Sequence, residues 1–278
     1  MPLLHWYEGD PVRTVGYARL STVLLTVLGC AGSAPGPNSP TSGYLLEADD
    51  FLLGVELGNG TLAALQAIRD PFELDALAFS HLHPDHCADF SALTVVRRYH
   101  PEPVRDPYVH RLPVYGPSEV HSRFVAAYSP DADDRATMDL SDVFDFRVLE
   151  PGTVRIGPFE VSAIHSRHPC ESFSFRFTHG GKTLGYTGDT ATFDGLADHF
   201  SGVDALLAEA SWTHADDRPD GLHLSGREAG ELAKRAGVGR LLVTHVPPWT
   251  DAAAVLGEAR AEYPGETVLV RQGLRYEI

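Results

Sequence analysis

Cysteine is scarce in this sequence, and no apolar stretch is long enough to cross a bilayer. The three cysteines, Cys30, Cys87 and Cys170, are too few and too irregularly spaced to form a disulfide framework. Such cysteine usage is typical of a reducing compartment, so we expect a cytoplasmic protein. The apolar run at 23–30 is far shorter than the roughly 20 residues that a membrane helix needs, and it lacks the charged start of a signal peptide. The sequence therefore predicts no membrane partner.

Positive charge is also in short supply. The 278 residues carry 22 basic and 38 acidic side chains, which gives a formal net charge of −16. Because such a field repels polyanions, we do not expect a general nucleic-acid-binding protein. A small anion can still be bound where a metal ion supplies positive charge locally.

The order of the expected elements favours one α/β domain at 20–278, preceded by an N-terminal extension at 1–19. Apolar or alternating stretches predict strands at 24–28, 44–47, 51–55, 74–79, 114–115, 146–149, 159–164, 172–178, 183–186, 205–208 and 241–244. Helical periodicity and capping signals predict helices at 61–68, 89–99, 117–128 with Pro117 first, 193–200, from the Ser225–Glu228 capping box to about 236, and 252–262. Loops are expected at 29–42 and 131–145, and a meander is expected over 146–186. Two sheets packed face to face with helices outside, an αββα sandwich, satisfy this order.

A dense run of metal-ligand residue types follows the expected strand 74–79. It reads Ser80-His81-Leu82-His83-Pro84-Asp85-His86, with four ligand-type residues within six positions. Residues at the end of a strand and in the tight turn after it can direct several side chains into one space. Imidazole and carboxylate together suit zinc or another first-row divalent ion. The alternative is a solvated turn that happens to be rich in histidine.

This run resembles the HxHxDH motif of the metallo-β-lactamase superfamily, and three later residues resemble further motifs of that family. His168 lies in Ser-Arg-His-Pro-Cys-Glu-Ser-Phe, Asp189 in Tyr-Thr-Gly-Asp-Thr, and His245 in Leu-Val-Thr-His. The resemblance extends from about residue 23 to the C-terminus and implies the four-layer αββα metallo-β-lactamase sandwich. It also implies two metal sites bridged by Asp189, one with His81, His83 and His168, the other with Asp85, His86 and His245. Two divalent ions are expected, Zn²⁺ first and Mn²⁺ as the alternative; a pair sharing one water yields hydroxide at neutral pH.

Three residues near the motifs raise further questions. His165 competes with His168 for the third motif, but the spacing to Phe173 favours His168 and leaves His165 as a supporting or surface residue. Relatives often have Asp-x-Gly after an early strand, whereas this chain has Glu56-Leu-Gly, which leaves open how the ligands are supported. Cys87 follows His86 directly, and we expect it to lie outside the ligand set.

Three segments resemble the ribonuclease Z-like phosphodiesterase branch of the superfamily. They are the loop that starts at Gly29-Cys-Ala-Gly, the acidic segment Ala208-Glu-Ala-Ser-Trp212, and His223-Leu-Ser-Gly before a helix. The resemblance implies that His223, supported by Glu209, is the general acid that assists the leaving oxygen while a metal-bridging hydroxide attacks phosphorus in line. Asp85 has two candidate roles, metal ligand and proton acceptor. The alternative for His223 is a structural residue at the helix start, packed beside Trp212.

Within that branch, several sequence segments are similar to segments of the atypical cyclic-nucleotide phosphodiesterases of actinobacteria. They are Ser80-His-Leu-His-x-Asp-His-Cys, Arg97-Arg-Tyr-His-Pro, Glu209-Ala-Ser-Trp-Thr-His and Leu222-His-Leu-Ser-Gly. This resemblance implies hydrolysis of 3′,5′-cyclic AMP to 5′-AMP, with a small-molecule cyclic nucleotide as the partner.

Other functions remain as alternatives. A ribonuclease Z-type endoribonuclease that processes the 3′ end of tRNA is the first, but the sequence has no long basic, glycine-rich insertion and its charge opposes a large RNA. A lactonase or thioesterase of the same fold is the second; His223 and Glu209 count against it. A non-catalytic metal-binding scaffold is a third, opposed by the complete ligand set.

Four residues are candidates for substrate binding. Arg97 and Arg98 could bind phosphate or ribose, although a solvated helix end explains them equally well. His214 could line the pocket, and Trp249 could stack on a base or simply pack beside Pro247 and Pro248. The sequence leaves both a monomer and a homodimer open.

Overall fold

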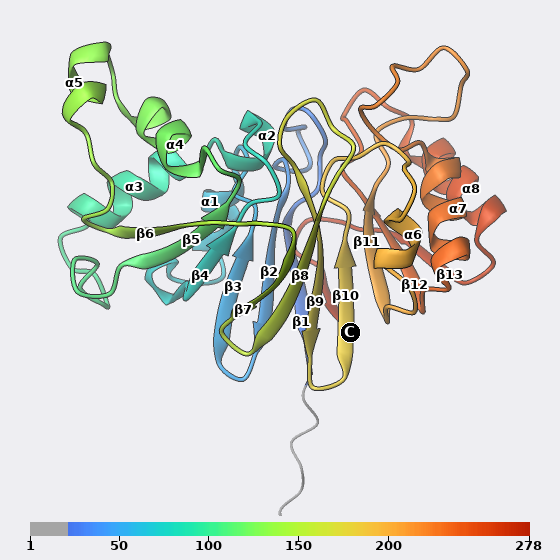
Figure 1. The fold of residues 1–278 in the computed structure, drawn as a ribbon, viewed down its shortest axis with the longest axis horizontal. Coiled ribbons are helices and arrows are strands. Elements are labelled where there is room, and N and C mark those ends of the chain that lie inside the picture. Colours follow the sequence, from blue (N-terminus) through green and yellow to red (C-terminus); the bar gives the residue numbers. More distant parts are fainter. Residues whose placement is uncertain (1–21) are drawn as a thin grey trace, which may run out of the picture.

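The structure is a computed structural model, and it describes residues 22–278 (Figure 1). Its strands form two seven-stranded mixed sheets. The first has the order β14-β1-β2-β3-β4-β5-β6, with bounds Arg275–Glu277, Leu24–Gly29, Gly43–Ala48, Phe51–Val55, Ala76–Ala78, Leu112–Gly116 and Phe144–Val148. The second has the order β13-β12-β11-β10-β9-β8-β7, with bounds Glu266–Leu269, Arg240–Thr244, Ala205–Glu209, Lys182–Tyr186, Phe173–His179, Phe159–His165 and Gly152–Ile156.

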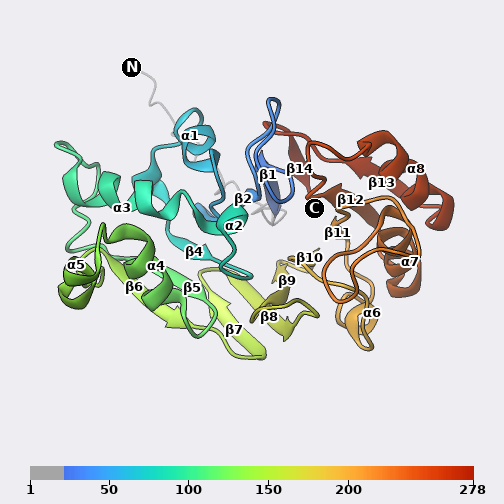
Figure 2. The same ribbon diagram turned by 90° about the horizontal axis from the view of Figure 1, so that it is seen from above.

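Helices cover the outer side of each sheet, as Figure 2 shows from above. Next to the first sheet lie α1 (Thr61–Gln66), α2 (Pro84–Cys87), α3 (Phe90–Tyr99), α4 (Val120–Tyr128) and α5 (Ala132–Thr137). Next to the second lie α6 (Leu196–His199), α7 (Gly226–Ala236) and α8 (Ala252–Glu262). One apolar cluster, rich in phenylalanine, fills the space between the sheets, and two more lie under the two sets of helices. The predicted αββα sandwich is confirmed.

The helix α7 shows how local sequence sets an element's bounds. The Ser225 hydroxyl accepts a hydrogen bond from the Glu228 N–H, and the Glu228 carboxylate accepts one from the Ser225 N–H. At the other end Gly237 has φ +63°, a left-handed conformation that glycine adopts without strain. The face with Ala229, Leu232, Ala233 and Ala236 is buried, as predicted.

The predicted meander was wrong at its first strand. The stretch expected at 146–149 belongs to β6, which pairs in parallel with β5 in the first sheet. The meander instead begins at β7, which pairs antiparallel with β8. The edge strand β7 escaped prediction because it is short and most of its residues are exposed.

Other boundaries also differ from the predictions. The helix expected at 117–128 begins at Val120, because Pro117 accepts the Val120 N–H in a preceding turn. The loop expected at 131–145 contains the exposed helix α5, capped by the Asp131 carboxylate. The short strands β13 and β14 were not predicted. The N-terminal extension expected at 1–19 lies outside the described residues. Among the described residues, no helix has the length and apolar character needed to cross a membrane.

Candidate metal centre

The side chains of the candidate site come from loops at one end of the two sheets. The strands β10, β11 and β12 are parallel neighbours, so their carboxyl ends meet at the same edge. Asp189 follows β10, Glu209 ends β11 and His245 follows β12. The histidine run follows β4 of the facing sheet, and His168 lies in the loop between β8 and β9. Residues far apart in the sequence therefore converge on the gap between the sheets.

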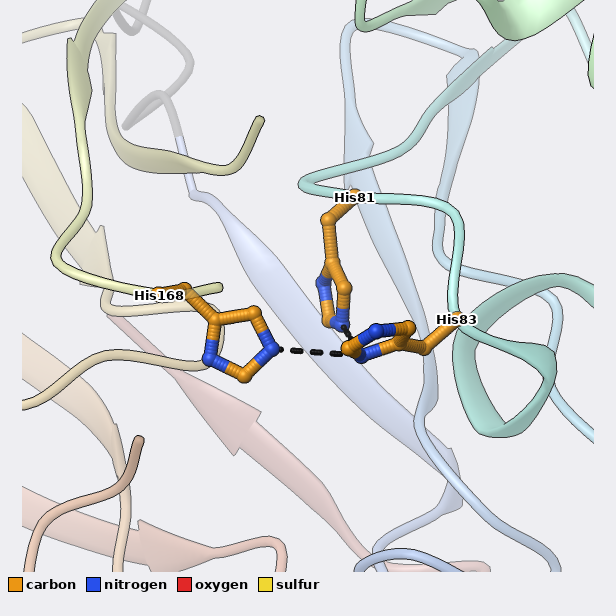
Figure 3. A group of neighbouring side chains, drawn as sticks. All are labelled: His81, His83 and His168. Carbon is orange, nitrogen blue, oxygen red and sulfur yellow. Dashed lines mark hydrogen bonds between the residues drawn. The ribbon is translucent and has the colours of Figure 1, made fainter. Parts of the chain in front are cut away.

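These residues form two adjoining groups of potential ligands, and a third group shares Asp189. His81, His83 and His168 form the first group, Asp85, His86, Asp189 and His245 the second, and Asp189, Glu209 and His223 the third. Figure 3 shows the first three rings turned toward one another from two separate loops. The Nδ1 atom of His83 lies 3.1 Å from Nε2 of His81 and 3.1 Å from Nε2 of His168.

Asp189 lies between the two groups. Its Oδ2 is 3.7 Å from Nε2 of His81 and 3.3 Å from Nε2 of His245, while its Oδ1 is 3.2 Å from Nε2 of His86. Asp85 reaches the second group, with Oδ2 at 3.7 Å from Nε2 of both His86 and His245. One carboxylate thus faces ligands of both sites, which is the arrangement that a bridging ligand requires.

Several buried polar atoms in this cluster have no hydrogen-bond partner among the described residues. They include Nε2 of His86, Nε2 of His245 and Oδ1 of Asp189, all of which point into the cluster. Unsatisfied buried polar atoms are costly and rare in folded proteins unless an ion or water satisfies them. Imidazole and carboxylate are the donors that zinc and similar divalent ions take. The buried histidines and aspartates therefore fit a dinuclear metal site.

Contacts behind the rings direct the ligand nitrogens toward the cluster. The Nδ1 atom of His245 is 2.8 Å from the Ser42 hydroxyl, and that of His168 is 3.0 Å from the Leu222 carbonyl oxygen. Such outer contacts fix the tautomer of a ligating histidine and leave Nε2 free for the metal.

Glu56, the residue that departs from the expected Asp-x-Gly, lies behind His86. It follows β3 with φ +63°, and its carboxylate is fully buried. Its Oε1 accepts hydrogen bonds from the Ser80 N–H at 3.0 Å and the Tyr186 hydroxyl at 3.3 Å, and it lies 3.5 Å from Nδ1 of His86. The Glu56 carboxylate therefore lies next to the ring of His86, one of the proposed ligands.

The electrostatics of the cluster depend on Asp189. Burial alone would raise the pKa of Asp189, but His245 and His86 hold it well below its usual range. Burial would likewise lower the pKa of His86, and Asp189 and Glu56 instead hold it well above its usual range. The carboxylate is therefore ionised and available as a metal ligand.

His223 and Glu209 form a buried pair at the edge of this cluster. The Nδ1 atom of His223 is 3.0 Å from Oε1 of Glu209 and 3.8 Å from Oδ2 of Asp189. Glu209 is held by the Thr190 N–H at 2.8 Å and the Ser211 hydroxyl at 3.0 Å. Burial would lower the pKa of His223, but Glu209 holds it above its usual value.

His223 lies both beside Trp212, as a structural residue would, and beside a cavity, as a general acid would. The ring also contacts Trp212 edge-on, with centroids 5.3 Å apart. Its Nδ1 is engaged by Glu209, and the ring lines a cavity of about 280 Å³ that also includes His214, Arg218 and Asp220. The Nε2 atom is thus available to a molecule in this cavity.

The loop 29–42 makes contacts with the site that sequence reasoning did not specify. The Ser33 N–H donates a hydrogen bond of 2.9 Å to Oδ2 of Asp85, and Ser33 has φ +61°. Gly32 packs so closely on His245 that a Cβ would lie 2.4 Å from the His245 carbonyl oxygen. The glycine-rich composition of this loop was the available signal, but only the fold shows which ligands it touches.

The four residues predicted to bind substrate lie in different surroundings. His214 does line the cavity beside His223, with Nδ1 at 3.0 Å from the Ser225 hydroxyl. Trp249 is 70% exposed and lines no cavity that includes His223. Arg97 is buried, donates to the carbonyl oxygens of Val143 and His110, and lines a different cavity from the one that includes His223.

Three further residues near the motifs, Arg98, His165 and Cys87, lie outside the groups of potential ligands. Arg98 binds the carboxylate of Asp142 through Nε and Nη2, and its role in substrate binding stays a prediction. His165 is exposed and stacks on Phe173, away from the ligands. Cys87 is buried with Sγ directed to the Leu82 carbonyl oxygen at 3.5 Å, outside both ligand groups.

A family model described as the beta-lactamase superfamily domain matches residues 57–246. This is more than half of the chain, which therefore belongs to the metallo-β-lactamase superfamily. Together with the buried cluster, this defines a metal-dependent hydrolase.

Three relatives are informative. The chain is 46% identical over 260 residues to an uncharacterised protein of Mycobacterium tuberculosis, covering 92% of both chains. It is 30% identical over 264 residues to the probable metallo-hydrolase YhfI of Bacillus subtilis, covering 91% of this chain and 99% of YhfI. The crystal structure of YhfI matches with a TM-score of 0.79 at 28% identity, over 93% of this chain and 100% of YhfI. A ribonuclease Z of Methanopyrus kandleri is 26% identical over 296 residues, covering 92% and 98%.

Proposed function

We propose that this protein is a dinuclear-metal phosphodiesterase of the cytoplasm that hydrolyses 3′,5′-cyclic nucleotides, converting cyclic AMP to 5′-AMP. The observation that carries the proposal is the His223–Glu209 pair, which lies against Asp189 and opens on a cavity. A hydrolase that splits a phosphodiester needs a proton donor for the leaving alkoxide, and His223 paired with Glu209 can be that donor. The resemblance to actinobacterial cyclic-nucleotide phosphodiesterases supports the substrate.

The proposed ligands are those implied by the sequence. His81, His83 and His168 would hold one ion, Asp85, His86 and His245 the other, and Asp189 both, with zinc the first choice and manganese the alternative. When bound, such a pair of ions lowers the pKa of a shared water and neutralises charge on the phosphate.

The chain's own residues then have distinct tasks. Burial would lower the pKa of His223, but Glu209 raises it to about 9, so the ring is protonated on both nitrogens at neutral pH. Glu209 accepts the hydrogen bond from Nδ1, and Nε2 carries the second proton. As the bond between phosphorus and O3′ breaks, His223 Nε2 gives that proton to O3′. Asp85, held by the Ser33 N–H, is placed to accept the proton lost by the attacking water. The water oxygen becomes part of the phosphate of 5′-AMP, so one water is consumed for each bond broken.

The cavity beside His223 favours a small substrate. Its volume of about 280 Å³ is near the lower end for small-molecule pockets. Its lining includes Asp216, whose charge would repel the phosphates of an RNA strand, whereas Asp220 pairs with Arg167 at 2.5 Å. His214 lies in the same cavity and is the remaining candidate for contact with the nucleotide.

A ribonuclease Z-type activity is the second candidate, because one relative carries that name and matches over nearly its whole length. The net charge of −16 is the observation against it. A lactonase or thioesterase of the same fold would have less use for a proton donor at the position of His223.

A substrate panel tests the proposal. The zinc-loaded and manganese-loaded protein is incubated with cyclic mononucleotides, linear bis-phosphodiesters, precursor tRNA and lactones, and products are separated by chromatography. We expect cyclic AMP to be converted to 5′-AMP. Cleavage of tRNA or opening of lactones without loss of any cyclic nucleotide would refute the proposed function.

A further inference from the structure

A second cavity lies at the end of the first sheet remote from the metal centre. It has a volume of about 410 Å³ and is lined by residues that precede β4, begin β5 and lie within β6. The metal-ligand run leaves the opposite, carboxyl end of β4. Asp75 in the cavity wall directly precedes β4, whereas His81 in the metal centre follows the opposite end of that strand, and the two sites share no residue. The two sites are therefore separate.

Four guanidinium groups gather around this cavity in a chain that is otherwise strongly acidic. They belong to Arg97, Arg105, Arg111 and Arg147. Since the whole chain has 22 basic residues against 38 acidic ones, such a gathering is unusual for it. Like charges repel when they converge, so an arrangement of this kind is stabilised by an anion between them.

The acidic residues of the wall neutralise only part of this charge. Asp75 pairs with Arg105 at 3.1 Å, and Asp145 pairs with Arg147 at 2.7 Å. Within residues 22–278, no carboxylate pairs with Arg111, whose Nη1 donates to the Ser141 carbonyl oxygen at 3.1 Å. Two arginines of the cavity thus keep their charge uncompensated: Arg97 and Arg111.

Arg97 is the more informative of the two because it is only 3% exposed. Its Nε donates to the Val143 carbonyl oxygen at 3.2 Å and its Nη2 to the His110 carbonyl oxygen at 2.8 Å. The guanidinium lies against the Phe72 ring, 5.7 Å from its centroid, and no carboxylate pairs with it in the described part of the chain. Burial lowers its pKa to about 10, so it is still a cation at neutral pH.

These contacts hold the Arg97 side chain firmly while leaving its charge unpaired. A buried charge without a partner of opposite sign is strongly unfavourable. The hydrogen bonds use Nε and Nη2, which leaves Nη1 for a ligand in the cavity that Arg97 lines. A planar guanidinium fixed in this way matches the oxygens of a phosphate group.

We infer that this cavity is a binding site for a small phosphate-bearing molecule, held by Arg97 and Arg111 with Arg105 at the rim. The volume is within the range of pockets for small ligands and too small for a folded partner. Phosphate is favoured over a monocarboxylate because the wall offers two uncompensated cations rather than one. The site is independent of the substrate proposed for the metal centre.

Calorimetric titration of the metal-loaded enzyme with inorganic phosphate tests this inference. We expect one phosphate site at this cavity, and a second where phosphate binds the metal ions. Arg111→Ala should weaken only the first, by about tenfold or more, the loss expected for one charge-assisted hydrogen bond, and Arg111→Lys should restore part of it. Arg235→Ala, an exposed arginine on α7, is the matched control and should leave both sites unchanged.

Two results would overturn the inference. The first is a wild-type protein that binds no phosphate. The second is an Arg111→Ala isotherm that superimposes on that of Arg235→Ala. A separate arm uses sedimentation with phosphatidylglycerol vesicles, and we expect no binding to them. Binding to vesicles without binding of free phosphate would assign the cavity to a lipid headgroup and reject the small ligand. Arg105→Ala provides a second variant at an exposed position, so the test does not depend on one substitution.

Discussion

The carboxylate of Glu56 lies 3.5 Å from Nδ1 of His86, and both side chains are completely buried. Hydrogen bonds from the Ser80 N–H and the Tyr186 hydroxyl hold that carboxylate in place. His86 lies between this carboxylate and Asp189, with Nε2 at 3.2 Å from Oδ1 of Asp189. A residue outside both ligand groups therefore lies directly behind one of the proposed ligands.

Replacing this carboxylate should weaken metal binding. We predict that Glu56→Gln lowers zinc affinity by about 10- to 100-fold, the usual effect of losing a partner behind a ligating histidine. Competition with a chromophoric chelator measures the affinity. Glu47→Gln is the control, because Glu47 pairs with Arg69 far from the cluster and should leave the affinity unchanged. Equal affinities for the two variants would show that Glu56 has no role in holding the metal.

Asp189 should be essential for both ions. Because its two oxygens face ligands of both groups, Asp189→Ala should leave neither ion firmly bound. Elemental analysis after gel filtration gives the metal content, which we expect to fall from about two ions to well below one per chain. Retention of one full equivalent would mean that Asp189 belongs to a single site and does not bridge.

His223 should affect turnover and leave metal content unchanged. We predict that His223→Ala slows cyclic AMP hydrolysis by about two to four decades while metal content stays near the wild-type value. Glu209→Gln should have a smaller effect in the same direction, since it loosens the ring without removing the donor. Loss of metal in His223→Ala would instead identify His223 as a ligand, which its 3.8 Å distance from Asp189 leaves open to test.

The part of the site that sequence could predict is the part encoded locally. His81, His83, Asp85 and His86 lie within one turn, so their spacing alone indicates a metal site. The distant residues were found only through family resemblance, because no local pattern states that the ends of β10 and β12 meet. The fold followed from buried strands with clear apolar patterns, and prediction failed at the exposed edge strand β7.

The sequence did not indicate where the side chains of Arg97 and Arg98 point. Arg97 and Arg98 are adjacent and chemically identical, and their position after the metal motif suggested substrate contact. In the structure one is buried against aromatic rings and backbone carbonyls, and the other pairs with Asp142. The direction of a long side chain depends on tertiary neighbours that the sequence does not display.

The close packing of Gly32 on His245 gives a steric prediction. A Cβ at position 32 would lie 2.4 Å from the His245 carbonyl oxygen and 2.8 Å from Cδ2 of its ring. Gly32→Ala should therefore displace His245 and lower metal affinity. Gly257→Ala is the matched control in exposed α8, where a Cβ meets nothing within 4 Å. It should leave metal affinity unchanged and stabilise the fold by about 0.5–1 kcal/mol. Similar metal affinities in the two variants would contradict the prediction.

His199 should make folding sensitive to mild acid. Burial, with a contribution from Arg176, lowers its pKa from 6.5 to about 4, and its Nε2 is buried without a hydrogen-bond partner in the described structure. Below pH 6.5 the unfolded chain takes up a proton at this residue while the folded protein does not. The free energy of unfolding should therefore fall as pH decreases from about 6.5 to 4, and this contribution should level off below pH 4. Urea unfolding of the metal-free wild-type protein and of His199→Leu at several pH values isolates the contribution of His199, because all other titratable groups are present in both proteins. We expect the advantage of the wild-type protein over the variant to shrink across that window; parallel pH profiles would show that His199 titrates normally in the fold.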